Sequence, residues 1–333
     1  MRNRSLDGLR GIAVLSVVIH HYFHAKLLWA GVDLFFVLSG YLITSILLRT
    51  KDKSFGPYIG TFYKKRVRRI LPPYAMLLVI VTLLLGAGWM AHGWLYFGLM
   101  NFAMPMHFDI PEQLGVLWSL AVEEQFYLLW PVAVYFLSGK HLERLTISLL
   151  FIAPFARFGC TRYFAHHWAM YMLLPFRMDT LAAGSLAALY WPRMKATCNG
   201  SRKFHLAWAG AAVLAVAMFG VLSRQGITTY NNTAIGNTAI YEATLLMVFS
   251  LFMVALSGGA KWLFELAPLV GMGTISYSVY LIHQTAKLQF NSVLVALAAT
   301  LIYAVAMWFA VEKPLTRRAV NEMIPSPPVL TRP

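Results

Sequence analysis

The chain of 333 residues has few charged residues and almost no cysteine. Only 12% of its residues are charged, whereas 59% are hydrophobic and the mean hydropathy is +0.62. A water-soluble domain of this length needs far less apolar sequence to fill its core. The composition therefore excludes a soluble globular protein and indicates that lipid surrounds most of the chain.

Several common chemical signatures are also missing. The two cysteines, Cys160 and Cys198, are expected on opposite sides of the membrane, which argues against a disulfide or a thiolate metal pair. The sequence has no Walker loop, no dinucleotide-type glycine loop and no repeat of 20–50 residues. His20, His21 and His24 lack a further nearby ligand, so we expect no metal.

What the chain has instead is a series of apolar runs long enough to cross a hydrocarbon core of ~30 Å. We expect an all-α, polytopic membrane helical bundle with about ten transmembrane helices over residues 1–315, followed by a short cytoplasmic tail at 316–333. The basic N-terminus belongs to a retained first helix rather than a signal peptide. The expected crossings are Leu6–Phe23, Ala30–Leu48, Leu71–Met90, Leu114–Leu137, Leu145–Cys160, Trp168–Trp191, His205–Leu222, Ala239–Leu256, Leu263–Ile282 and Phe290–Val311.

The positive charges give this bundle an orientation. Ten crossings put both termini on one side, and 21 of the 28 lysines and arginines fall on that side. The positive-inside rule then predicts cytoplasmic termini in the plasma (inner) membrane, and it explains the net charge of +15 without nucleic acid. Trp94–Met106 is too short for an easy crossing, so we expect it to be interfacial or re-entrant.

Ionisable residues inside the crossings are functional candidates, because lipid cannot solvate them. In the first crossing, Arg10 and His21 are 11 positions apart, which places them on one helix face about 16 Å apart along the axis. Asp33 begins the second crossing near the same outer surface as His21. It is expected to orient His21 as a base; the alternative is a pairing that only holds the hairpin together.

Later crossings add further candidates. Glu123 and Glu124 lie deep in the fourth crossing, where they either form structural ties with Arg177 or Arg10 or line a catalytic cavity. We assign Glu123 to the catalytic group. The candidates for substrate contacts are Arg177, Asp179, Tyr127, Tyr277 and His283.

A basic run precedes the third crossing. Arg66 and Arg69, three residues apart, would share one helical face and could grip phosphates, with Lys65 and Tyr63 beside them. The phosphates of a nucleotide-bearing donor such as acyl coenzyme A could bind to these arginines. Such a run is otherwise only a topology anchor near anionic lipid.

Taken as a set, these residues resemble the bacterial membrane acyltransferase 3 family along nearly the whole chain. The first motifs are Leu6 to Ala13 with His21; Gly31 to Phe36 with Ser39 and Gly40; and Phe62 and Tyr63 through Arg66, Arg69, Ile70 and Pro72. The later motifs are Trp118 to Leu120 with Val122, Glu123, Phe126 and Tyr127; Arg177 with Asp179 and Gly184; Ile275 to Ser278 with Tyr280 to His283; and Glu312 with Pro314.

The resemblance implies a helical membrane bundle, an acyl donor that is commonly acetyl coenzyme A, and an extracytoplasmic acceptor that is commonly a sugar hydroxyl of a glycan or glycolipid. The family's arginine followed by a histidine corresponds to Arg10 and His21, and its paired arginines correspond to Arg66 and Arg69. Relatives often carry a soluble C-terminal hydrolase-like domain, and no such extension is expected after Glu312.

The sequence thus predicts an integral membrane O-acyltransferase. His21 would act as the base, Asp33 would orient it, and Arg10 or Tyr127 would stabilise the oxyanion. A proton-coupled transporter or flippase is the alternative, because buried charges also make proton relays, and a purely structural membrane partner is a third possibility. The acceptor, the acyl chain length, the choice between direct transfer and an acyl-enzyme, and the oligomeric state stay open.

Overall fold

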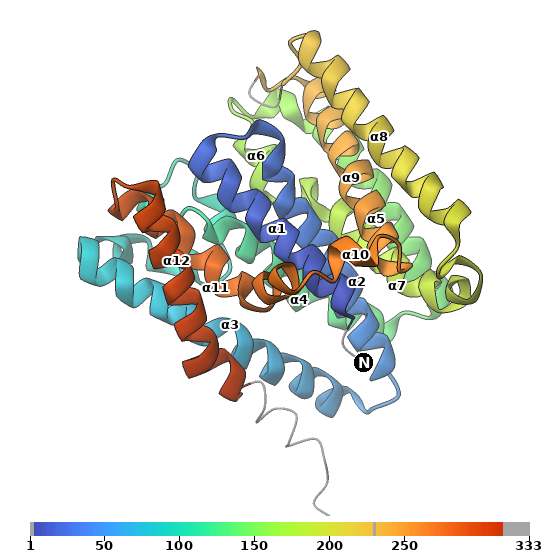
Figure 1. Cartoon of the computed structure of the whole chain (residues 1–333), viewed down its shortest axis with the longest axis horizontal. Helices are drawn as coiled ribbons and strands as arrows, with labels where there is room; N and C mark the ends of the chain where they lie inside the picture. Colours follow the sequence, from blue (N-terminus) through green and yellow to red (C-terminus); the bar gives the residue numbers. More distant parts are fainter. Residues whose placement is uncertain (1–2, 229–230, 316–333) are drawn as a thin grey trace, which may run out of the picture.

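The computed structural model describes residues 3–228 and 231–315, and all regular structure in this part of the chain is helical (Figure 1). The predicted tail at 316–333 lies outside the described residues. The α-helices are α1 (Arg4–Phe23), α2 (Gly31–Arg49), α3 (Phe55–Leu85), α4 (Leu117–Phe136), α5 (Gly139–Cys160), α6 (Trp168–Met172), α7 (Met178–Cys198), α8 (Arg202–Arg224), α9 (Ala234–Leu256), α10 (Lys261–Phe264), α11 (Ala267–Gln289) and α12 (Val293–Met307).

Six helices in the described residues are long and apolar enough to cross a membrane, which confirms a polytopic membrane bundle. Four other helices, α1, α4, α7 and α11, have 20 to 23 residues but are interrupted by polar side chains. These four carry the candidates His21, Glu123, Asp179 and His283, whereas Asp33 lies in α2. Ten crossings and cytoplasmic termini stay predictions, although the start of α1 and the end of α12 lie on the same side of the bundle in Figure 1.

The apolar helices lie around the polar ones. In Figure 1, α8 runs along one edge of the bundle and α12 along the other, with α1 and α2 between them. Helix α8 packs on α9, where Phe204 and Trp208 contact the core and Ala215 is buried, while most of its other apolar side chains are exposed. Such a helix, apolar on nearly all sides, is suited to contact lipid.

Two boundaries differ from the prediction. Helix α3 begins at Phe55 rather than near Leu71, so the basic run belongs to the same helix as the third crossing. The sixth crossing is not continuous: Pro175, which lacks an amide proton, lies in the 3₁₀ turn Leu174–Phe176 between α6 and α7. Leu173 is extended there (φ −81°, ψ 136°), and α7 starts only at Met178. Residues 88–114 form short 3₁₀ turns and no crossing-length helix, as expected.

Glycines allow the central helices to touch backbone to backbone. A Cβ atom added to Gly273 of α11 would lie 1.8 Å from the carbonyl oxygen of Asp7 in α1. One added to Gly184 of α7 would lie 2.0 Å from the carbonyl oxygen of Val37 in α2. Small residues at such positions let membrane helices approach closely and gain packing energy.

A buried ion pair joins α2 to the start of α7. Arg177, just before α7, donates to the Asp33 carboxylate in α2, and both side chains are about 1% exposed. The Arg177 guanidinium also lies 4.6 Å from the ring centre of Tyr241 in α9. A charge here without its partner would be strongly unfavourable.

A second buried arginine continues this network toward α5. Arg157 of α5 donates to the carbonyl oxygen of Phe176 and to the Asp179 carboxylate, the latter at 2.6 Å. It also pairs with Glu242 of α9. The two ion-paired arginines therefore tie α2, α5, α7 and α9 together.

We predict that Gly273→Ala destabilises the protein by about 1–3 kcal/mol, because the added methyl group collides with the backbone of α1. Gly271→Ala, two residues earlier in α11, is the matched control, because a Cβ there meets nothing within 4 Å. Thermal unfolding in detergent, followed by size-exclusion chromatography, compares the two. Equal unfolding temperatures would contradict the close contact of α1 and α11.

For the ion pair, we predict that Asp33→Asn and Arg177→Gln each lower the stability by about 3 kcal/mol, because each leaves an unpaired buried charge. The double variant should be more stable than either single variant, since it removes both charges. Thermal unfolding of the four proteins tests this double-mutant cycle. Additive losses would show that the two side chains do not depend on each other.

Candidate active site

Three adjoining cavities lie in series along α1. The first, the His21 cavity, measures about 310 Å³ and lies at the end of α1, where it is lined by His20 and His21. The second, the connecting cavity, measures about 80 Å³ and is lined by Arg10 and Glu123. The third, the basic cavity, measures about 1020 Å³ and begins at the start of α1.

Shared lining residues join these cavities. Val32 and Tyr280 line both the His21 cavity and the connecting cavity. The residues that line both the connecting cavity and the basic cavity are Arg10, Ser39, Arg66, Arg69 and Tyr127. The series therefore runs from one end of α1 to the other, through the middle of the bundle.

The imidazole of His21 is held from behind by a second histidine. Its Nδ1 lies 2.9 Å from Nε2 of His283 in α11, and Nδ1 of His283 lies 2.6 Å from the carbonyl oxygen of Tyr280. His283 is fully buried, and it is not among the residues that line the His21 cavity. The predicted substrate contact by His283 is therefore wrong, since His21 stands between that ring and the cavity.

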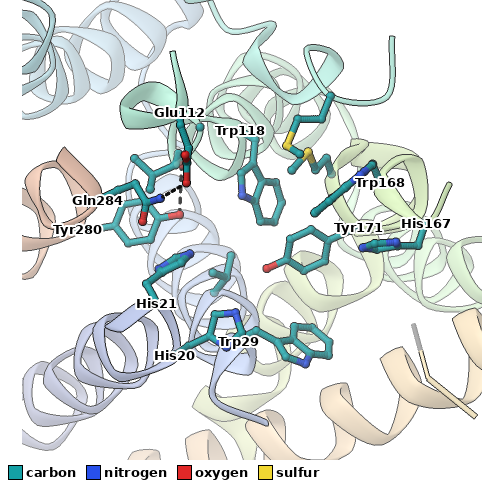
Figure 2. A pocket seen from close by; sticks show the side chains of 15 residues that line it. His20, His21, Trp29, Glu112, Trp118, His167, Trp168, Tyr171, Tyr280 and Gln284 are labelled. Atoms are coloured by element: carbon teal, nitrogen blue, oxygen red, sulfur yellow. Dashed lines mark hydrogen bonds between the residues drawn. The ribbon is translucent and has the colours of Figure 1, made fainter. Parts of the chain in front are cut away.

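The His21 cavity has a polar side and an aromatic side (Figure 2). His20 and His21 lie near Tyr280, Gln284 and Glu112, and Gln284 donates to Glu112 at 3.2 Å. The opposite side is formed by the aromatic residues Trp118, Trp168 and Tyr171. Such a lining suits a ligand that has both hydroxyl groups and apolar faces.

One histidine on the aromatic side lies in the connection before α6. Its ring, that of His167, stacks near Trp168 with the ring centres 4.3 Å apart. Burial lowers the pKa of His167, and the neighbouring His166 lowers it further. A neutral His167 adds hydrogen-bonding capacity to the cavity without adding charge.

The predicted contact between Asp33 and His21 is wrong. Asp33 is paired with Arg177, and His21 is in contact with His283. Both Asp33 and His21 lie near the connection between α1 and α2, but the packing of α7 against α2 places Arg177, and not His21, against the Asp33 carboxylate. Asp33 is therefore part of the ion-pair network and does not orient the histidine.

The connecting cavity gathers the predicted cations. Arg10, Arg66 and Arg69 line it together with Glu123, whose carboxylate accepts hydrogen bonds from Ser39 and Tyr127. The Arg66 guanidinium lies 5.6 Å from the ring centre of Tyr127. Three arginines and one carboxylate leave the cavity positive, which suits an anionic ligand.

The basic cavity adds cations that the sequence analysis treated only as topology signals. Seven basic residues line it against two acidic ones, Asp7 and Glu265. The basic residues are Arg4, Arg10, Arg49, Arg66, Arg69, Lys195 and Lys261. They come from four different helices and from the residue that begins α10, so only the folded bundle brings them together.

Several predicted site residues lie elsewhere. Tyr63 donates to the carbonyl oxygen of Leu128, and neither Tyr63 nor Lys65 is among the residues of the three cavities. Arg177 and Asp179 are held in buried ion pairs, and neither is among the residues that line the three cavities. These side chains already have partners, so they have a structural role.

The predicted oxyanion donors and one substrate residue lie in the connecting cavity rather than beside His21. Arg10 and Tyr127 line the connecting and basic cavities and are not among the residues that line the His21 cavity. Tyr277 also lines the connecting cavity, where its hydroxyl donates to the carbonyl oxygen of Ile70. Arg10 is three helical turns from His21, and this distance alone could have excluded it.

The sequence analysis missed the residues at the junction of the cavities. Tyr280 lines both the His21 cavity and the connecting cavity, and its hydroxyl lies 2.5 Å from Ser119 Oγ. Gln284 follows Tyr280 by one helical turn and reaches the same cavity. The spacing of four residues in α11 was a usable signal, because such residues share one face of a helix.

Comparisons with known proteins agree with this arrangement. Residues 3–311 match the family described as an acyltransferase domain. The chain is 32% identical over 306 residues to the O-acetyltransferase OatA of Staphylococcus aureus, covering 84% of this chain and 49% of that protein. It is 29% identical over 321 residues to the peptidoglycan O-acetyltransferase OatA of Listeria monocytogenes, covering 84% and 48%.

The chain spans about half the length of these relatives, and no solved structure matches it significantly. The family match covers nearly all of the described chain and includes the helices that form the three cavities. The chain therefore belongs to the acyltransferase 3 family of membrane proteins.

Proposed function

We propose that the chain is an integral membrane O-acyltransferase that moves an acetyl group from cytoplasmic acetyl coenzyme A to a hydroxyl of an extracytoplasmic carbohydrate. The observation that carries this proposal is the series of cavities along α1, with cations at one end and His21 at the other. Within this series, Arg10 lies about 16 Å from His21 along the helix.

The donor's nucleotide suits the basic cavity. Coenzyme A carries several phosphate groups, and arginines bind phosphate with paired hydrogen bonds. Arg66 and Arg69 lie at the junction with the connecting cavity, while Arg49 and Lys195 line only the basic cavity. The nucleotide would occupy the wide cavity at the cytoplasmic side, and the phosphates nearest the pantetheine would lie against Arg66 and Arg69.

The pantetheine arm suits the connecting cavity. That cavity is narrow, about 80 Å³, and its walls include the apolar side chains of Phe35, Phe36 and Ile70. A thin, flexible chain can enter such a space when its bulky nucleotide cannot. The thioester would then reach the side of Tyr280 that faces His21.

The acceptor suits the His21 cavity. A sugar presents hydroxyl groups along its edge and C–H groups on its faces, which matches a polar side opposite an aromatic side. Gln284 is 8% exposed, and its Oε1 has no hydrogen-bond partner within the described part of the chain. A hydroxyl of the acceptor would satisfy that oxygen.

The reaction would use His21 as the base. The imidazole takes the proton of the acceptor hydroxyl while the oxygen attacks the thioester carbonyl carbon. The carbon–sulfur bond then breaks, the acetyl ester forms, and the proton passes from His21 to the departing thiolate. The Tyr280 hydroxyl, which donates to the carbonyl oxygen of Val116 in the free protein, lies at the junction of the two cavities and would turn to the developing oxyanion.

The relatives suggest the type of acceptor. One of them is named a peptidoglycan O-acetyltransferase, so we propose a glycan of the cell envelope as the acceptor here. Peptidoglycan is the first to test. A surface polysaccharide or glycolipid would use the same chemistry.

We predict that His21→Ala lowers acetylation of the envelope glycans by at least about 100-fold, because the reaction loses its base, whereas binding of acetyl coenzyme A stays within about twofold. The readout is base-labile acetate on purified peptidoglycan and polysaccharide from expressing cells. Binding is measured by titration calorimetry of purified protein.

The control is His24→Asn, which changes an exposed histidine directly after the last residue of α1. Asparagine tolerates the left-handed backbone of that position (φ 54°). Full acetylation by His21→Ala would remove His21 from the chemistry. Loss of acetyl coenzyme A binding as well would place the histidine in donor binding instead.

For the donor end, we predict that Arg66→Ala and Arg69→Ala each weaken acetyl coenzyme A binding by about 10- to 100-fold, because each removes a charged contact to phosphate. Titration calorimetry gives the Kd. Lys64→Ala is the matched control, because it removes the same charge from an exposed position of α3 outside the three cavities.

If Arg66→Ala and Arg69→Ala changed the Kd for acetyl coenzyme A no more than Lys64→Ala does, the basic run would serve only to orient the protein in the membrane. A proton-coupled transporter makes a different prediction, because it needs no specific site for acetyl coenzyme A. Wild-type protein that shows no saturable binding of acetyl coenzyme A would therefore favour the transporter over the acyltransferase.

A further inference from the structure

The contact between His21 and His283 fixes where the protons of both rings lie. We propose that His283 is a positioning residue that holds His21 in the Nδ1–H tautomer and so presents a bare Nε2 to the acceptor. This inference rests on the proposed function for its catalytic meaning. Its structural content, the tautomer of His21, stands on the hydrogen bonds alone.

The argument begins at the carbonyl oxygen of Tyr280. A carbonyl oxygen can only accept a hydrogen bond, and it lies 2.6 Å from Nδ1 of His283. Nδ1 of His283 therefore carries a proton. A neutral imidazole has one N–H group, so Nε2 of His283 is an acceptor.

The acceptor on His283 then decides the tautomer of His21. Nε2 of His283 lies 2.9 Å from Nδ1 of His21, and two bare nitrogens cannot form a hydrogen bond. Nδ1 of His21 must therefore carry the proton. The other ring nitrogen, Nε2, has a free electron pair, which is the state that a general base requires.

The opposite arrangement would need a cationic His283. A doubly protonated ring could donate from Nε2 to His21, but the side chain of His283 is 0% exposed. Within the described part of the chain, its ring nitrogens contact the Tyr280 carbonyl oxygen and His21, and neither is an anion. Burying a cation without a carboxylate partner is strongly unfavourable, so the neutral ring is favoured.

The tightest helix contact in this region sets the distance between the two rings. Helices α1 and α11 touch at Gly11 and Gly273, and the Tyr22 hydroxyl donates to the carbonyl oxygen of His283 at 3.0 Å. The backbone contact at these glycines fixes the register of α11 against α1, and the hydrogen bond is one addition to it. This register places His283 beside the last turn of α1, where His21 faces the cavity.

His283 lies behind His21 and not at the cavity, as expected of a residue that acts by positioning His21. Figure 2 shows His21 at the edge of the cavity near Tyr280 and Gln284, whereas His283 is not among the lining residues. When His21 Nε2 takes the proton of the acceptor, His283 stabilises the resulting cation by accepting from its Nδ1–H. The proton later leaves Nε2 for the thiolate, and both rings return to their starting state.

The kinetic test compares His283→Leu with His283→Gln. Leucine fills the space without an acceptor, whereas the glutamine Oε1 can accept from His21 Nδ1. We expect leucine to lower kcat for acetyl transfer by about 100-fold with KM for acetyl coenzyme A within about twofold. Glutamine should restore at least a tenth of the wild-type kcat.

Tyr22→Phe is the structural control, because it removes the hydrogen bond to the His283 backbone and leaves both rings in place. A purely structural role for His283 predicts that leucine and glutamine affect kcat equally, in step with the unfolding temperature. That outcome would overturn the inference while leaving the acetyl transfer of the wild-type protein intact.

A second measurement needs no acceptor. Nitrogen-15 NMR of histidine-labelled protein in lipid bilayers distinguishes protonated from bare ring nitrogens, and the His21 signals are those lost in His21→Ala. We expect a protonated Nδ1 and a bare Nε2 in the wild-type protein, with the other tautomer populated in His283→Leu. A protonated Nε2 in the wild-type protein would overturn the inference, even if the enzyme transfers acetyl groups as proposed.

Discussion

A charged side chain within the hydrocarbon of a membrane must be enclosed by protein, because lipid offers it no partner. This constraint organises the whole bundle. Helices α1, α4 and α11, which carry His21, Glu123 and His283, lie inside, and the largely apolar α8 lies at the edge with most of its side chains exposed. The same enclosure that makes these charges tolerable also creates the space between them where a substrate can be held.

The enclosed charges fall into two groups, and pairing separates them. Arg157 and Arg177 are held by carboxylates and by the ring of Tyr241, so they join helices. Arg66 and Arg69 face a cavity with more positive than negative charge. Arg66 and Arg69 are therefore better candidates for binding phosphate than the ion-paired Arg157 and Arg177. Burial alone would not separate the two pairs of arginines.

The contact between α1 and α11 connects stability to chemistry. Backbone approach at Gly273 brings the two helices close enough for His21 and His283 to share a hydrogen bond. Two neutral histidines in series serve a buried site well, because they orient a base without adding a fixed negative charge. In this bundle the available carboxylate, Asp33, is used to neutralise Arg177 instead.

The amino-acid sequence by itself determined the all-α membrane class, the positions of most helices, and the shared face of Arg10 and His21. These features follow from composition and from the repeat of a single helix, which backbone geometry sets locally. It also indicated Arg66 and Arg69 as a pair, since their spacing of three residues lies within one helix. The break before α7 could have been foreseen from Pro175, whose effect is local as well.

Only the tertiary structure decided which side chains meet across helices. Asp33 contacts Arg177, 144 residues away in sequence, rather than His21, which is close to it in the chain. His21 contacts His283 at a separation of 262 residues, and Arg49, Lys195 and Lys261 line one cavity from three different parts of the chain. Such partners depend on how helices pack and in what register, and the pattern along one helix does not contain that information.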